Sequence, residues 1–109
     1  MSPRAYLLQR GTAVLMAPMV LTHLVMVIIA VHGGLSAEDI LSRTRGSLGW
    51  GAFYALFVLA ASLHAGIGLQ TVGREWLGLG RRGVAIFGHA FTAILVVMGL
   101  RAVYAVVLA

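Results

Sequence analysis

The sequence contains no cysteine, and it is poor in proline and in charged residues. The absence of cysteine excludes disulfides, zinc–thiolate sites and cysteine-ligated iron–sulfur clusters within this chain. Charged residues make up 10% of the sequence and hydrophobic residues 61%, whereas a typical soluble domain has about a quarter charged and about half apolar residues. The composition therefore excludes an ordinary soluble domain and predicts an integral membrane protein.

Three long apolar runs occupy most of the chain. A membrane-spanning helix needs about 20 apolar residues, so the 109 residues of this chain hold three spans and leave no room for a soluble catalytic domain. We expect an all-α integral membrane protein that forms a single membrane-anchor domain over residues 1–109. Its transmembrane helices are predicted at about 11–32, 50–73 and 84–108.

Two local signals refine this layout. Pro18 interrupts the first apolar run, and it is expected to kink that helix. Between the first and second runs, Ser36 stands three residues before Asp39. This spacing is a variant N-cap, and it predicts a short surface helix in the polar segment 35–49.

The basic residues are all arginines, and most of them stand at the ends of the predicted spans. This distribution is typical of membrane orientation rather than of nucleic-acid binding. Short cytoplasmic loops carry an excess of basic residues. We therefore expect the N-terminus in the cytoplasm and the C-terminus outside, in a bacterial inner membrane. The cytoplasmic arginines would then be Arg4, Arg10, Arg74, Arg81 and Arg82.

Three histidines, His23, His64 and His89, lie within the apolar runs. Ionisable residues inside a span are costly, and each is by default a candidate functional residue. In an apolar, cysteine-free helical protein, a common use of histidine is axial ligation of haem. The alternative is that each histidine hydrogen-bonds to a neighbouring helix, or that His89 lines a proton path.

The second apolar run carries two stripes of residues at helical spacing. His64, Gly68, Thr71 and Glu75 return to nearly the same face of a helix. Gly68, one turn from the histidine, would leave space for a flat macrocycle. The other stripe consists of small residues that allow a neighbouring helix to approach closely. Its members are Ala61, Ser62, Ala65, Gly66 and Gly73.

Two segments carry a family resemblance. The string HAGIGLQTVGREW at 64–76 resembles the second-helix signature of the succinate dehydrogenase and fumarate reductase membrane-anchor subunits. That signature is a haem-ligating histidine, a glycine four residues later, and an acidic–aromatic pair. The segment 8–14 resembles the start of the family's first helix, where an arginine near the quinone head group precedes Ser or Thr by two residues.

The resemblance implies a role for each matched residue. His64 would be an axial ligand of haem b, which makes it the metal-binding residue, and Arg10 would lie near the haem propionates or the quinone. Glu75 and Trp76 would lie by the quinone pocket, where the family more often has Asp and Tyr. Arg74 is a further quinone candidate on the same side.

The sequence leaves open which residue is the second axial ligand of the haem. His23 resembles the outer-haem ligand of the di-haem branch of the family. The second axial ligand of the His64 haem would come from a partner anchor subunit, a second copy of this chain, or His23. An ion pair between Arg10 and Glu75 is expected to make a cationic donor tolerable at low dielectric.

The sequence thus predicts a haem b-binding anchor subunit of a succinate:quinone oxidoreductase, with ubiquinone or menaquinone as substrate. By resemblance, its partners are a flavoprotein subunit, an iron–sulfur subunit and a second anchor subunit or copy, with lipid around them. Two alternatives stay open: the b-type cytochrome anchor of another respiratory dehydrogenase, and a non-redox structural or assembly protein of the membrane.

Overall fold

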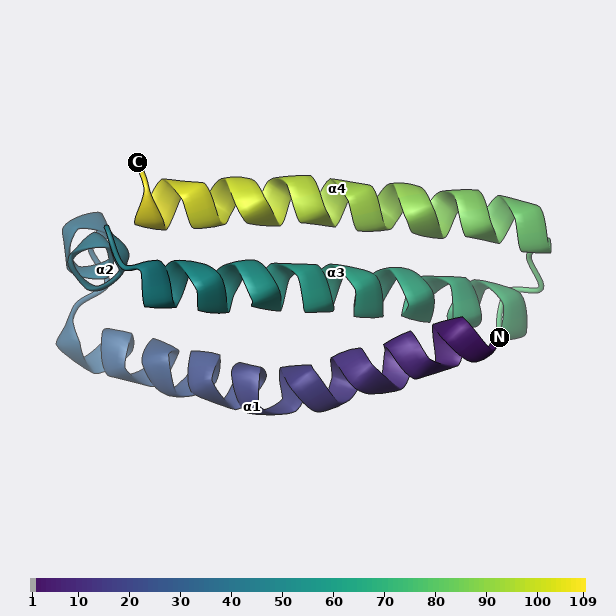
Figure 1. Ribbon diagram of the computed structural model, residues 1–109, viewed down its shortest axis with the longest axis horizontal. Coiled ribbons are helices and arrows are strands. Elements are labelled where there is room, and N and C mark those ends of the chain that lie inside the picture. The colour runs from purple at the N-terminus through teal and green to yellow at the C-terminus, as the bar shows by residue number, and fades with distance from the viewer. Residues whose placement is uncertain (1) are drawn as a thin grey trace.

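The protein is built from four α-helices, as the computed structural model of residues 2–109 shows (Figure 1). They are α1 (Pro3–Gly33), α2 (Ala37–Thr44), α3 (Leu48–Glu75) and α4 (Arg81–Val107). Of these, α1, α3 and α4 are long and apolar enough to cross a membrane. The predicted all-α membrane fold with three candidate spans is therefore confirmed.

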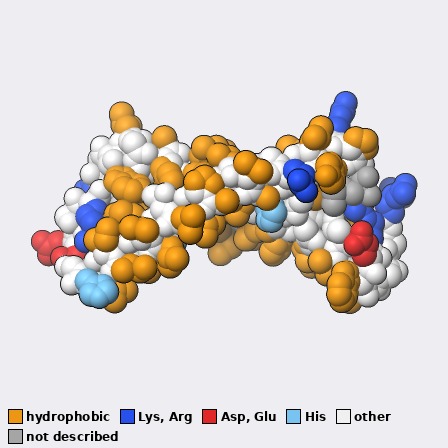
Figure 2. Space-filling model, turned by 90° about the horizontal axis from the view of Figure 1, so that it is seen from below, with side chains coloured by type: hydrophobic (Ala, Val, Ile, Leu, Met, Phe, Trp, Pro, Cys, Tyr) orange, Lys and Arg blue, Asp and Glu red, His pale blue; other side chains and the backbone are white. Residues whose placement is uncertain are grey.

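The three long helices lie side by side in a row, with α3 in the middle (Figure 1). Helix α3 packs against both α1 and α4. Within residues 2–109 no large side chain is completely buried. Figure 2 shows hydrophobic side chains over the middle of the molecule, with the acidic side chains in view near its two ends. An apolar exterior without a closed core fits a chain that lies in lipid.

Helix α1 begins earlier than the apolar run predicts. It starts at Pro3 rather than near residue 11, because Ser2 caps it and proline is well tolerated in the first helical turn. The Ser2 hydroxyl accepts a hydrogen bond from the Ala5 amide at 3.2 Å. The apolar run therefore marks the membrane-spanning part of a longer helix. Helix α1 is also bent, and Pro18 lies within it (Figure 1).

The short helix α2 lies across one end of the row. Its N-cap is Ser36, whose hydroxyl accepts from the Asp39 amide at 3.1 Å and donates to the Asp39 carboxylate at 2.6 Å. At the other end of α2, the Thr44 hydroxyl donates to the Val106 carbonyl of α4 at 2.7 Å. The surface helix predicted from the spacing of Ser36 and Asp39 is confirmed.

The small-residue stripe of α3 faces α4. Ser62, Gly66 and Gly73 are buried there, while Ala61 and Ala65 are only half-buried. A Cβ added at Gly66 would overlap the Thr92 hydroxyl and lie 3.2 Å from the Gly88 carbonyl oxygen. The two helix backbones approach closely because glycine leaves that space empty.

The two ends of the row carry different charges. The N-terminus, the end of α3 at Arg74 and the start of α4 at Arg81 lie at one end, and α2 and the C-terminus lie at the other (Figure 1). We call the first end the arginine end. It carries Arg4, Arg10, Arg74, Arg81 and Arg82.

Candidate functional site

His64 lies on the face of α3 that packs against α1. Its Nδ1 atom is 3.2 Å from the hydroxyl oxygen of Thr12, a side chain that is only 8% exposed. The Thr12 hydroxyl has one hydrogen, and it donates this hydrogen within its own helix, to the Leu8 carbonyl at 2.7 Å. When the Thr12 hydroxyl donates to Leu8, its oxygen can accept a hydrogen bond from the Nδ1–H tautomer of His64, and in that tautomer the Nε2 lone pair is available to a ligand.

Gly68 faces the same helix junction one turn away. A Cβ at this position would lie 3.4 Å from the Gln9 side-chain nitrogen, so Gln9 covers part of the space that the sequence predicted over Gly68. The Gln9 side-chain oxygen is buried and has no hydrogen-bond partner among residues 2–109. Thr12, Gln9, His64 and Gly68 together form what we call the His64 cluster. It contains the imidazole of His64 and one unpartnered amide oxygen, that of Gln9.

Thr71 and Glu75, the two residues of the predicted stripe that lie nearest the end of α3, are not part of this cluster. The Thr71 hydroxyl donates to the Ile67 carbonyl of its own helix at 3.1 Å. Glu75 is exposed at the last residue of α3. The stripe therefore lies on one face of α3, as predicted, but only His64 and Gly68 are in the cluster with α1.

His23 faces α3 at a different depth in the row. Its ring meets Tyr54 at 6.2 Å and Phe57 at 5.7 Å between centroids, both edge to face. Phe57 and Tyr54 precede His64 by two and three turns, or roughly 10 to 15 Å along α3. His23 and His64 thus lie at different depths along α3, which weighs against one iron shared by both, and the option of His23 as the second ligand of the same haem stays a prediction.

A cavity of about 680 Å³ opens at the arginine end, between α1, α3 and α4. Arg4, Arg74 and Arg81 line it, one from each long helix, together with His89 and Gln70. Neither His64 nor any acidic residue is among the lining residues within 2–109. This cavity was not predicted from the sequence. The spacing of Leu63, Ile67, Gln70 and Arg74, which places them on one face of α3, was the available signal.

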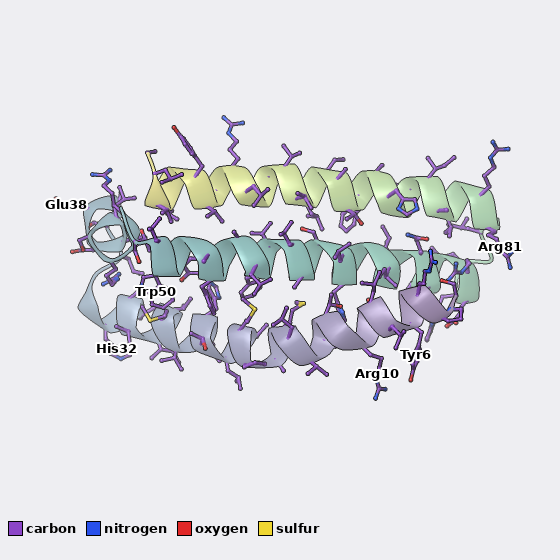
Figure 3. All side chains as sticks on the ribbon, in the orientation of Figure 1. Tyr6, Arg10, His32, Glu38, Trp50 and Arg81 are labelled. Atoms are coloured by element: carbon purple, nitrogen blue, oxygen red, sulfur yellow. The ribbon has the colours of Figure 1, made fainter. Side chains whose placement is uncertain are left out.

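The four quinone candidates are dispersed over the arginine end. Arg10 points away from α3, and its guanidinium lies over the Tyr6 ring at 5.8 Å (Figure 3). The expected ion pair between Arg10 and Glu75 is therefore wrong, because Arg10 occupies the outer face of α1. Trp76 is 81% exposed, whereas Arg74 is half-buried and lines the cavity.

Within residues 2–109 no group of three or more His, Cys, Asp or Glu side chains could hold a metal ion. A metal held mainly by its own macrocycle would need only axial ligands from the protein.

Comparison with known families gives one match. A family model described as the succinate dehydrogenase/fumarate reductase transmembrane subunit matches residues 4–105. The matched range includes the whole of α3 and nearly all of α1 and α4. No curated protein and no solved structure matches the chain.

Proposed function

The chain belongs to the transmembrane-subunit family of succinate dehydrogenase and fumarate reductase, and from this premise we propose that it binds haem b through His64. As a member of that family it is a membrane subunit that associates with the catalytic subunits of the complex. In the proposal, the complex is a succinate:quinone oxidoreductase of the bacterial inner membrane. The flavoprotein subunit carries out the dicarboxylate chemistry, and electrons pass through the iron–sulfur subunit to quinone at this anchor.

The observation that carries the haem proposal is the hydrogen bond between Thr12 and His64. With Thr12 as the acceptor, the proton would stay on Nδ1 and the Nε2 lone pair would be left for iron, which is the usual arrangement of a metal-bound histidine whose other nitrogen is held by the protein. The small residue at Gly68 and the unpartnered oxygen of Gln9 lie beside it. These residues fit an axial ligand site. Haem b would supply one-electron transfer there.

The residues of this chain would act on that site in separate ways. His64 binds and orients the cofactor through Nε2, and Thr12 holds the proton on Nδ1. The apolar exterior of α1 and α3 keeps water away from the middle of the bilayer. One chain supplies one axial ligand in this geometry. We therefore propose that the second comes from a partner anchor subunit or from a second copy of this chain.

The test of this proposal is the reduced-minus-oxidised spectrum of the purified complex, with Thr12 as the variable. We expect a b-type band in the wild type. In Thr12→Val we expect the haem affinity to fall by at least about tenfold, because a hydrogen bond to a metal-binding histidine typically contributes that much to metal affinity. The midpoint potential should rise, since the lost hydrogen bond makes the imidazole less basic.

Thr12→Ser is the matched control, because it restores the hydroxyl without the methyl group. It should keep the wild-type spectrum and potential. A complex without a b-type band would overturn the haem proposal and favour a non-redox membrane protein. Equal potentials in Thr12→Val and the wild type would remove Thr12 from the ligand site.

We also propose that quinone is reduced at the arginine end, with Arg10, Arg74, Glu75 and Trp76 as its candidate contacts. Quinone carbonyl oxygens need hydrogen-bond donors next to an apolar slot, and the indole N–H of Trp76 and the two guanidinium groups are donors. All four belong to the arginine end, with Arg10 on the outer face of α1, Arg74 in the cavity, and Glu75 and Trp76 exposed at the end of α3. The iron–sulfur subunit would dock at this end, which we assign to the cytoplasm together with the N-terminus.

Quinone reductase activity with saturating succinate tests these contacts. In Trp76→Phe we expect a several-fold rise of KM for quinone, because an aromatic ring is kept while the indole N–H donor is lost with the five-membered ring that carries it. Arg10→Gln should have a similar effect. Tyr104→Phe, an exposed residue near the opposite end of the row, is the control. Unchanged kinetics and inhibitor sensitivity in both Trp76→Phe and Arg10→Gln would contradict the assignment.

A further inference from the structure

We propose that the cavity at the arginine end is a binding site for an anionic phospholipid. The first support is its charge. Arg4, Arg74 and Arg81 converge on this cavity from three different helices, and no acidic side chain lines it within the described chain. Three guanidinium groups around one cavity give it a positive potential, which attracts an anion. Guanidinium groups also match the geometry of a phosphate, which they can bind with two parallel hydrogen bonds.

The second support is the polarity gradient of the cavity wall. On α3 the lining residues run from Arg74 through Gln70 to Ile67 and Leu63. This change from charged to polar to apolar extends over 11 residues, or roughly 16 Å from the end of the helix toward the middle of the membrane. A phospholipid has the same order of groups along its length. Its phosphate would lie at Arg74 and its acyl chain against Ile67 and Leu63.

Helix α1 repeats this gradient, whereas the lining residues of α4, which are Arg81, His89 and Thr92, are all polar. On α1, Arg4 lies one turn outside Leu8, and both line the cavity. On α4, Arg81 stands at the first helical residue, where the N-cap Gly80 provides no side-chain cap. The free amides at a helix N-terminus add to the attraction for an anion. Basic pockets between membrane helices are typical sites for anionic lipid headgroups.

The site is separate from the proposed haem ligand. His64 points to the junction with α1 and does not line the cavity. Since the argument uses only the cavity and the membrane location of the chain, it does not depend on haem binding. Arg74 is also a candidate quinone contact, but a neutral quinone inside the cavity would leave the charge of the three arginines without a counter-ion, so an anionic lipid is the better match for the cavity itself.

The experiment measures lipid retention by the intact complex. The complex is purified in detergent, incubated with phosphatidylglycerol or with phosphatidylcholine, and analysed by native mass spectrometry. We expect phosphatidylglycerol to be retained preferentially, and its apparent affinity to fall about fivefold in Arg81→Gln, the usual contribution of one basic residue to anionic lipid binding. Arg4→Gln should behave in the same way, and Arg81→Lys should recover most of the binding.

Arg82→Gln is the matched control, because Arg82 is adjacent in sequence and exposed but does not line the cavity. An equal loss in Arg82→Gln and Arg81→Gln would mean general attraction to the surface, and it would overturn the site. Displacement of the lipid by inorganic phosphate alone would show a free phosphate site instead. Loss of haem, or of the catalytic subunits, in Arg81→Gln with unchanged lipid retention would assign the arginines to those contacts and also overturn the proposal.

Discussion

Replacing His64 by Leu is expected to remove one haem from the purified complex and to abolish its b-type band. Leucine has a similar volume and no nitrogen, so the variant loses the Nε2 ligand with little change in apolar packing. It also leaves the Thr12 hydroxyl without its partner, but that hydroxyl still donates to the Leu8 carbonyl of its own helix. Haem content per complex and the reduced-minus-oxidised spectrum are the measurements.

His89→Leu is the matched control for this variant. His89 is also a histidine of a membrane-spanning helix, but it lines the arginine-end cavity rather than the junction of α1 and α3. It should keep the full b-type band. His23→Leu should keep the His64-bound haem as well, since His23 packs against Tyr54 and Phe57 at another depth. An unchanged spectrum in His64→Leu would reject His64 as the ligand.

The second large effect is expected at the contact between α3 and α4. In Gly66→Leu the new side chain would collide with Thr92 and with the backbone of α4 at Gly88. Overpacking of this kind costs about 1–3 kcal/mol, and a backbone neighbour can yield less than a flexible side chain. We expect a lower temperature of thermal unfolding and a reduced yield of assembled complex.

Gly83→Leu makes the same substitution at a position of α4 where an added Cβ meets nothing within 4 Å. It should be neutral or slightly stabilising, because leucine is the better helix former by up to about 1 kcal/mol. A double variant gives an internal check. Thr92→Ala should recover part of the stability lost in Gly66→Ala, since it removes the hydroxyl that the new Cβ would overlap. Equal stability of Gly66→Leu and Gly83→Leu would contradict close packing at Gly66.

Local sequence patterns were sufficient for the helices. The apolar runs predict α3 and α4 to within a few residues, and the Ser36–Asp39 spacing predicts α2. The start of α1 was missed because it depends on the Ser2 cap and on residues that do not belong to the apolar run. A polar first turn outside the membrane has no hydropathy signal.

The contacts between side chains of the site could not be predicted from the sequence. Spacing alone placed His64 and Gly68 on one face, but it could not identify Thr12 as the partner, since that contact depends on how far α1 is shifted along α3. The same holds for the cavity, whose arginines come from three helices. Arg10 shows the limit most clearly. Its position at the correct end was predictable, and its outward direction was not.

The row of helices has a consequence for how the protein is made. A ribosome synthesises α1 first, but the only long helix that it packs against to any extent is α3, which follows after the whole of α2. During that interval the Thr12 face of α1 has no neighbour from its own chain. Lipid or another membrane protein must cover it. The contact between His64 and Thr12 can therefore form only after two spans have come together, and a cofactor that needs this contact would be loaded after that step.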